Sequence, residues 1–340
     1  MTQQQVINEP FAVRWKRRSV TIPTMLLGTA AVIFAAPVVA PVLFVADMAR
    51  ARWKLPMLRL YTFAAQYAVN DSIEILLAPW YWILARFGTT LHSSASIRRH
   101  ERVQRWSVAI LARRAEQLLG IRVELDDIGA VALLPTPAIV LCRHVNVIDS
   151  SLPSLLYQQR DRRVRDVIMA ELLADPGFDL FYGRLGSIFI PRDNGPEARH
   201  AVTALGASLD ANSVAVIFPE GRLFRPELLE RAKAKLAERD PARIDGIAQL
   251  RHVLPARPGG VNALLDALPT ADVVVIAHFG LDAYPDFKSL IRNVPAGITV
   301  NATAWRIARR DIPNDPAARM RWLDATWQSV DDWIDSQGVR

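Results

Sequence analysis

A histidine and an aspartate separated by four residues form the first pair of side chains in this sequence that could do acid–base chemistry. They are His144 and Asp149, in the stretch "LCRHVNVIDSSLP" that follows the apolar run "PAIVLC". Five residues of α-helix rotate by about 500°, so the two would not share a face of a regular helix. They meet only if His144 lies in a loop and Asp149 in the first helical turn. Asp149 would then accept a hydrogen bond from one ring nitrogen and leave the other free to take a proton from an alcohol. Taken alone, the spacing is weak evidence, because such a pair more often marks a polar loop without chemistry.

Three further stretches place glycines or charged residues where strands are expected to begin or end. Gly186 opens an apolar run that Arg192 follows, in "LGSIFIPRDNG". Glu220 and Gly221 follow a second run, in "VIFPEGRLFRPE". The last stretch, "HVLPARPGGV" at 252–261, is rich in proline and glycine and predicts a loop that could line a pocket wall. Strand ends are where α/β proteins usually place their functional residues, so these stretches are candidates for one site.

The elements that must position these residues begin at about residue 120, where short β-branched runs alternate with helical patterns. Strands are predicted at "IRVEL", "AIVLC", "RDVIMA", "SIFI", "SVAVIF", "DVVVIAH" and "ITVNATAW". Helices are predicted at "EARHAVTALGASLD", "PELLERAKAKLAER" and "PAARMRWLDATWQSVDDWIDSQ". This alternation predicts an α/β domain with a largely buried sheet.

The sequence before residue 120 predicts association with a membrane. Residues 22–46 carry no charge and are long enough to cross a bilayer as a helix. Pro37 and Pro41 could kink this run or form the tip of a re-entrant hairpin. A second apolar stretch, 56–87, holds two acidic residues near its middle, so it predicts a second span, two half-buried helices or an interfacial segment. Basic residues flank the first run on both sides, which favours a re-entrant loop or two crossings.

Composition supports a membrane partner. Lys and Arg outnumber Asp and Glu by 41 to 34, and 51% of the residues are apolar. A basic, oily chain favours an anionic membrane surface over nucleic acid, for which no binding motif is present. "SIRRHERVQRWSVAILARR" predicts a basic amphipathic helix that faces lipid head groups or packs on the next domain. We expect a basic tail at 1–21, a membrane-embedded or interfacial helical region at 22–90, the amphipathic helix at 91–119 and a catalytic domain at 120–340.

In their order along the chain, the four stretches resemble the glycerolipid acyltransferases of the 1-acylglycerol-3-phosphate O-acyltransferase family. The matching blocks are "RHVNVID", "GSIFIPR", "FPEG" and "VLPARPGG". The fourth block and "VVVIAHFGLD" are most similar to the branch with lysocardiolipin-type acyltransferases. The resemblance covers about 120–310. It implies a mixed sheet flanked by helices, with an N-terminal membrane-anchoring helical segment.

The resemblance implies a membrane-bound enzyme of phospholipid biosynthesis or remodelling. Such an enzyme transfers a fatty acyl chain from an acyl thioester to the hydroxyl of a lysophospholipid similar to lysophosphatidate. His144 would be the general base and Asp149 would orient it. The donor would be acyl-CoA or an acyl carrier protein thioester, and neither a metal nor a bound cofactor is expected. The partners would be the lysophospholipid, the donor and anionic membrane lipids. The expected location is the cell membrane, with the catalytic domain on its cytoplasmic face.

The remaining site residues are expected to contact substrate. Arg192, with Arg222 or Arg225, would hold the phosphate of the acceptor. Backbone amides near Gly186 or Gly221 are candidates for stabilising the oxyanion that forms when the hydroxyl attacks the thioester.

The third block departs from the family pattern. That pattern usually reads Phe-Pro-Glu-Gly-Thr-Arg, and here Arg222 takes the place of the threonine and Leu223 that of the arginine. In the family that arginine is thought to hold the acceptor's phosphate, so the departure changes the geometry of a bidentate clamp. Glu220, just before the departure, is expected to position the arginines or a glycerol hydroxyl.

Three other interpretations stay open. One is a CoA-independent transacylase on the same fold. Another is a non-catalytic membrane lipid-binding protein, which the altered third block allows and the retained pair of His144 and Asp149 argues against. The third pairs His144 with the single cysteine, Cys142, as a nucleophile, although Cys142 ends an apolar run and buried thiols are usually inert. One cysteine excludes an intramolecular disulfide and a multi-cysteine metal site.

Overall fold

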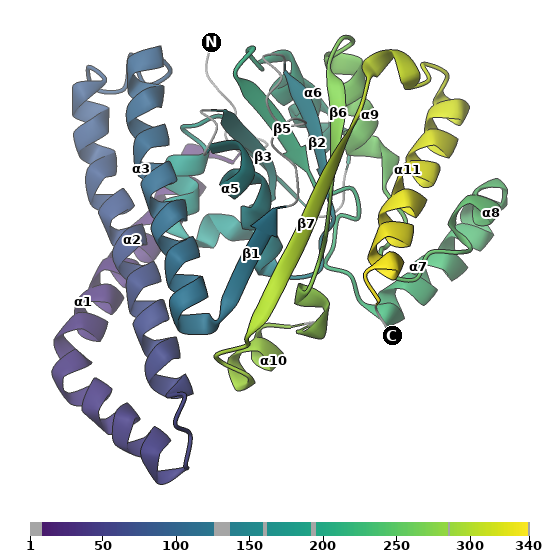
Figure 1. Ribbon diagram of the computed structural model, residues 1–340. Coiled ribbons are helices and arrows are strands. Elements are labelled where there is room, and N and C mark those ends of the chain that lie inside the picture. Colours follow the sequence, from purple (N-terminus) through teal and green to yellow (C-terminus); the bar gives the residue numbers. More distant parts are fainter. Residues whose placement is uncertain (1–8, 126–136, 159–161, 192–194, 285, 339–340) are drawn as a thin grey trace. The chain divides into compact units, whose positions relative to one another are not determined.

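The computed structural model describes residues 9–125, 137–158, 162–191, 195–284 and 286–338 (Figure 1). The chain divides into two compact units. Unit 1 comprises Met1–Arg122, Ile168–Pro191 and Lys288–Ile298, and unit 2 comprises Val123–Val167, Arg192–Phe287 and Thr299–Arg340. The domain bounds expected at residues 21, 90 and 119 stay predictions.

Seven strands form one mixed sheet in the order β1-β7-β6-β2-β5-β3-β4. The strand β2 pairs in parallel with β5 and β6, β3 pairs in parallel with β5, and β7 is antiparallel to β6. Every strand coincides with a predicted run, because buried β-branched segments of this length are typical of a covered sheet. The predicted fold class, a mixed sheet flanked by helices, is confirmed. The strands are β1 (Ile121–Leu125), β2 (Ala138–Cys142), β3 (Arg163–Met169), β4 (Ile188–Ile190), β5 (Ser213–Ile217), β6 (Asp272–Phe279) and β7 (Ile298–Ile307).

Helices cover both faces of the sheet in unit 2. On one face, Val140 of β2 and Leu156 of α5 belong to the same buried cluster. On the other face, α9 approaches β5 so closely that a Cβ at Gly260 would lie 2.4 Å from Ile217 Cδ1. The helix α11 packs against β6 and α8, with Trp327 fully buried. These helices are α5 (Leu152–Gln158), α6 (Pro196–Ala207), α7 (Pro226–Arg239), α8 (Ile244–Ile247), α9 (Pro258–Ala267) and α11 (Pro316–Ser336), and α10 (Phe287–Arg292) begins at the end of unit 2.

The start of α9 corrects one prediction. The stretch 252–261 was expected to be a loop throughout, but its proline-glycine end forms the first turn of α9, which begins at Pro258. Proline suits the first helical position, because its φ angle is preset and its missing N–H would have no partner within the helix. Pro258 therefore starts a helix here.

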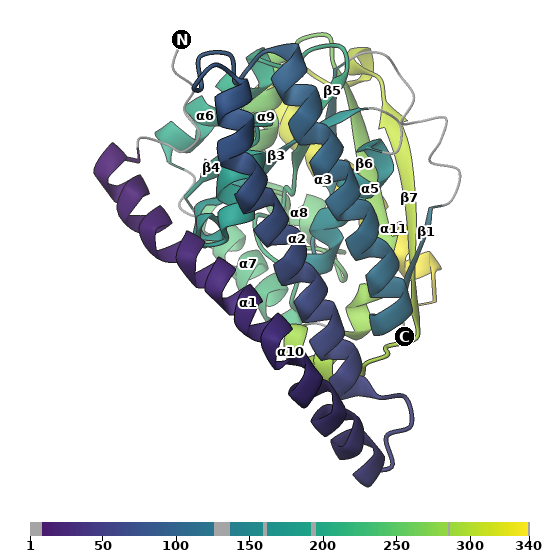
Figure 2. The same cartoon turned by 90° about the vertical axis from the view of Figure 1, so that its left-hand side faces the viewer.

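Unit 1 is built around three long helices, α1 (Phe11–Ala49), α2 (Pro56–Leu84) and α3 (Ser94–Arg114). The helices α2 and α3 lie side by side in Figures 1 and 2, and α1 runs at an angle to them and contacts α2. The helix α1 continues through Pro37 and Pro41, so a hairpin tip at these prolines is wrong. The two prolines stand about one turn apart, so the backbone hydrogen bonds that they remove lie on one side and the other side stays intact. The chain reverses instead between α1 and α2, where Asp47 Oδ2 accepts hydrogen bonds from the N–H groups of Met57 and Leu58 at 3.0 and 3.2 Å.

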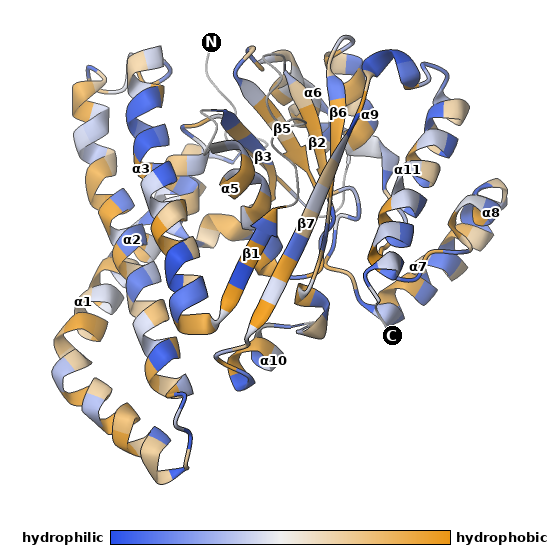
Figure 3. Ribbon diagram, viewed as in Figure 1, coloured by the Kyte–Doolittle hydropathy of each residue, from blue (hydrophilic) through white to orange (hydrophobic). Residues whose placement is uncertain are grey.

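Within the described part of the chain, α1 alone is long and apolar enough to cross a membrane. Figure 3 colours much of this helix as hydrophobic, and its apolar side chains include Leu27, Phe34 and Val38, which are 70%, 85% and 69% exposed. The helix α2 packs on α1 and does not meet that criterion, and the placement of 56–87 relative to a membrane stays a prediction. Hydrogen bonds join the two helices, from Ser72 Oγ to Thr29 Oγ1 at 2.8 Å and from the Tyr61 hydroxyl to the carbonyl of Val32.

The basic helix predicted after residue 90 is present as α3. It buries a stripe of polar side chains, and Asn70 of α2 donates a hydrogen bond to the carbonyl of Ser107 at 3.3 Å. This face therefore packs on α2, and a contact between α3 and lipid head groups stays a prediction.

An ion-paired carboxylate ties the start of α1 to a short helical turn, Phe178–Tyr182. Asp179 accepts hydrogen bonds from Arg17 at 2.7 Å and from two nitrogens of Arg18 at 2.8 Å. Arg17 also donates to the carbonyl of Leu173 at 2.7 Å. We call these contacts the Asp179 tie.

Candidate active site

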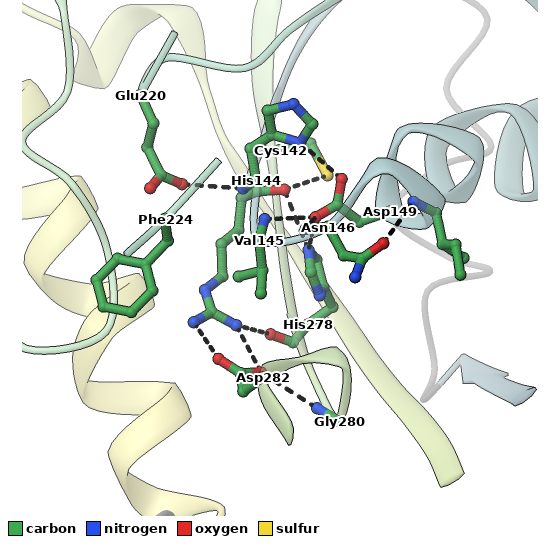
Figure 4. Close-up of polar contacts among 12 residues, drawn as sticks. Cys142, His144, Val145, Asn146, Asp149, Glu220, Phe224, His278, Gly280 and Asp282 are labelled. Atoms are coloured by element: carbon green, nitrogen blue, oxygen red, sulfur yellow. Dashed lines mark hydrogen bonds and ion pairs between the residues drawn. The ribbon is translucent and has the colours of Figure 1, made fainter. Parts of the chain in front are cut away.

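The catalytic candidates His144 and Asp149 lie just beyond the carboxyl end of β2, which has a parallel neighbour on each side. His144 Nδ1 and Asp149 Oδ1 are 2.7 Å apart (Figure 4). Asp149 is the third residue of a short helix, Val147–Ser151, and Asn146 caps that helix. The cap is reciprocal, since the Asn146 side chain accepts from the N–H of Ile148 at 3.2 Å and Asp149 Oδ2 accepts from the N–H of Asn146 at 2.8 Å. This cap turns Asp149 back toward the loop histidine, which is the arrangement that the spacing requires.

Asp149 is a fully buried carboxylate with several donors around it. Its Oδ2 also accepts from the N–H of Val145, and His278 Nε2 lies 3.5 Å from the same oxygen. Burial alone would raise the pKa of Asp149, but the neighbouring His144 and His278 outweigh burial and hold it below its ordinary value. Asp149 is therefore ionised and can stabilise a positive charge on His144.

The second nitrogen of His144 is free for chemistry. Burial lowers the pKa of His144, but the charge of Asp149 and its hydrogen bond outweigh burial and raise the pKa above its ordinary value. The ring packs on Phe218, with centroids 4.5 Å apart, and the side chain remains 19% exposed. No hydrogen-bond partner for Nε2 exists among the residues that the structure describes. An approaching hydroxyl could therefore meet this nitrogen.

Glu220 fixes the backbone on which His144 stands. Its Oε1 accepts from the N–H of His144 at 2.9 Å and its Oε2 from the N–H of Leu254 at 2.8 Å. Burial raises the pKa of Glu220 to about 7, against the opposing effect of these two N–H groups. None of the described arginines donates a hydrogen bond to it, so the expected contact with a phosphate-binding arginine is not part of this geometry. Glu220 instead joins the first, third and fourth blocks.

Arg143, which precedes the histidine, is a buried crosslink that sequence reasoning did not place. Its guanidinium pairs with Asp282 at 2.5 and 3.0 Å and donates to the carbonyls of His252 and His278 at 2.7 and 2.8 Å. Gly280, with φ of +119°, donates to Asp282 at 3.3 Å (Figure 4). These partners are more than 100 residues from Arg143 in sequence, and their only signals were the quoted runs "VVVIAHFGLD" and "HVLPARPGGV".

The predicted substrate-binding residues of the third block lie near the His144 loop. Arg225 Nη1 donates to the carbonyls of Val145 and Phe224 at 3.1 and 2.5 Å, so it braces that loop. Arg222 is exposed. Gly221 has φ of +64°, in the left-handed region that favours glycine, and its own N–H donates to the carbonyl of Phe218 at 3.0 Å.

The described part of the second block belongs to unit 1, whereas the catalytic candidates belong to unit 2. Gly186, with φ of +91°, belongs to unit 1, and Arg192 lies outside the described residues. The roles expected for both stay predictions.

Cys142 belongs to the hydrophobic core of the sheet. It is fully buried, and its thiol donates to the carbonyl of Arg143 at 3.4 Å. Burial and the charge of Asp149 raise the pKa of the Cys142 thiol well above its ordinary value, which argues against a thiolate nucleophile. Across the described ranges, no group of three or more histidine, cysteine or acidic side chains could hold a metal ion.

Residues 127–278 match a family model described as Acyltransferase. This segment contains His144, Asp149 and Glu220. Among solved structures, the chain is similar to the crystal structure of the 1-acyl-sn-glycerophosphate (LPA) acyltransferase PlsC from Thermotoga maritima. The two share 13% sequence identity with a TM-score of 0.48, over 80% of this chain and 98% of that chain. No curated protein matches the sequence.

Proposed function

We propose that this protein is a membrane-bound O-acyltransferase that moves a fatty acyl chain from an acyl thioester to the hydroxyl of a lysophospholipid. The observation that carries the proposal is the pairing of His144 with the ionised Asp149 at 2.7 Å, with Nε2 of His144 unpartnered within the described chain. The acyltransferase match over residues 127–278 supports the same reaction class.

The reaction begins when His144 Nε2 takes the proton of the acceptor hydroxyl while the hydroxyl oxygen attacks the thioester carbonyl. Asp149 keeps the proton on Nδ1 and stabilises the imidazolium that forms. The tetrahedral oxyanion then collapses, the carbon–sulfur bond breaks, and the thiolate leaves and takes the proton back from His144. Glu220 and the reciprocal cap at Asn146 keep His144 and Asp149 in position relative to each other during these steps.

We further propose that the acceptor is similar to lysophosphatidate and that the donor is acyl-CoA or an acyl carrier protein thioester. The proposal also places the chain in the 1-acylglycerol-3-phosphate O-acyltransferase family and in its lysocardiolipin-type branch. The exposed apolar surface of α1 supports a location in the cell membrane, and we place the catalytic unit on the cytoplasmic face among anionic lipids. Arg192 and a backbone amide near Gly186 complete the proposed substrate contacts.

The test is a radiolabelled acyl-transfer assay on membranes with oleoyl-CoA and a panel of lysolipids. His144→Ala is expected to lower the rate about a hundredfold to ten-thousandfold, because it removes the base. His200→Ala, on the exposed surface of α6, is the matched control and should retain full activity. Equal product from wild type and His144→Ala would overturn the proposal. If neither protein forms product with CoA or carrier-protein donors, the proposal is also overturned, and that result would favour transacylation or lipid binding.

A further inference from the structure

The side chain of Arg257 lies against the turn after β5, close enough to Arg222 for the charge of Arg222 to act on it. Gly221 has no side chain, and a Cβ placed there would lie 3.2 Å from Cδ and Nη1 of Arg257. The Arg257 side chain therefore lies across the backbone of Gly221, the residue that precedes Arg222 in the chain. Arg222 is exposed and Arg257 is half-buried, so the pair can be reached from solvent.

The backbone brings Arg257 to this turn. Its N–H donates to the carbonyl of Pro219 at 2.8 Å, one residue before Glu220. Glu220 in turn binds the N–H groups of both His144 and Leu254. The fourth block is thus fastened to the third at two points, and both points lie close to the candidate base.

The two guanidiniums have no acidic partner. In the part of the chain that the structure describes, no carboxylate forms a hydrogen bond or an ion pair with the side chain of Arg222 or Arg257. Two buried arginines elsewhere in unit 2 do have an acidic partner, since Arg143 pairs with Asp282 and Arg243 with Asp324. Burial and the nearby charge of Arg222 both lower the pKa of Arg257. Two adjacent, unneutralised cations favour an anion between them.

We propose that Arg257 and Arg222 together bind a phosphate monoester of a substrate, and that Arg257 supplies the guanidinium that the third block lacks at Leu223. The inference rests on the proposed acyl transfer for the identity of the substrate. A phosphate monoester carries close to two negative charges at neutral pH, whereas a phosphodiester carries one, so two guanidiniums select the monoester. Arg225 is already engaged with the carbonyl of Val145, which leaves Arg257 as the second cation of the pair.

Two substrates of the proposed reaction carry such a group, a lysophosphatidate acceptor and the 3′-phosphate of a CoA donor. Steady-state kinetics separates them. If the acceptor is bound, Arg257→Gln raises KM for lysophosphatidate about tenfold to a hundredfold and changes KM for the phosphodiester lysophosphatidylglycerol less than about threefold. If the donor is bound, KM rises for oleoyl-CoA and not for its analogue without the 3′-phosphate. The control is Arg321→Gln, an exposed arginine on α11, which should leave every KM unchanged.

A binding measurement keeps this inference separate from the proposed function. Glycerol 3-phosphate should raise the thermal midpoint of the full-length wild type and of Arg321→Gln, and should not raise that of Arg257→Gln. Arg257→Lys keeps the charge and should restore part of the shift, which excludes a folding defect. If no acyl transfer is found but this difference persists, the proposed function fails and the phosphate site stands. If transfer is normal and neither KM nor the midpoint shift responds to Arg257→Gln, the phosphate site is overturned.

Discussion

The two units each bury an ionised aspartate, and the two aspartates are held in different ways. Asp149 in unit 2 and Asp179 in unit 1 are 0% and 4% exposed. Burial would raise the pKa of each, but the surrounding hydrogen-bond donors outweigh burial and lower both pKa values. Similar electrostatics therefore arise from two sets of partners.

The difference lies in what the partners can do. The hydrogen bonds of Asp149 come mainly from the imidazole of His144 and from backbone N–H groups at most five residues away in sequence, and a second imidazole, that of His278, lies 3.5 Å from Oδ2. Asp179 is held by two guanidiniums from about 160 residues away. An imidazole can give up and regain a proton near neutral pH, whereas a guanidinium stays charged. The first arrangement can therefore transfer protons, and the second can only hold chain segments together.

The largest effect that should separate the two sites is the loss of rate in Asp149→Asn. A neutral amide would not hold the imidazolium or fix its tautomer, so kcat/KM is expected to fall about a hundredfold to ten-thousandfold. Asp179→Asn should change kcat less than about threefold, because the Asp179 tie contains no proton-transferring group. Initial rates and circular dichroism on both variants check this, and comparable rate losses in the two would contradict the distinction.

The second effect is on stability, and it belongs to unit 1. The double variant Arg17→Gln/Arg18→Gln leaves the buried carboxylate of Asp179 without its cations, which is expected to cost about 3–5 kcal/mol of unfolding free energy. Hydrogen exchange in the turn Phe178–Tyr182, measured in detergent, should accelerate. Arg14→Gln is the matched control, because Arg14 lies 3.9 Å from Glu9, is 34% exposed and does not touch Asp179. Equal destabilisation by Arg14→Gln would refute the conclusion that Arg17 and Arg18 stabilise unit 1 through Asp179.

The smallest effect is a difference in pH dependence. His144 must be neutral to accept a proton, and its pKa is raised, so kcat/KM should rise with pH through a midpoint above 6.5. The pKa of Asp179 is lowered, so the stability that the tie contributes is present above 3.8 and is lost only as pH falls below that value. The rate and the thermal midpoint should be measured together from about pH 5 to pH 9. The rate is expected to rise over this range, while the contribution of the Asp179 tie to the free energy of unfolding stays constant. A rate midpoint below 6.5 would contradict the raised pKa.

The same contrast explains which features could be read from the sequence. His144 and Asp149 were recognisable because the cap that joins them is local, and the strands were recognisable because buried β-branched runs are local too. The partners of Arg143, the contact of His278 with Asp149 and the Asp179 tie join distant segments, and no spacing rule connects them. Pro37 and Pro41 were misleading as a hairpin signal, because a long apolar helix continues past them. Pro258 was misleading as a loop signal, because it starts α9.

The position of Cys142 makes thiol labelling a measure of how often the strand that supports His144 opens locally. The chain has one thiol, and this thiol is fully buried in β2, two residues before His144. A thiol reagent can reach it only when that strand separates from its neighbours, so the labelling rate in native buffer reports how often the support of the base comes apart. A substrate that binds at His144 should slow the labelling. Occupancy of the site can thus be followed by mass spectrometry without turnover and without an added probe residue.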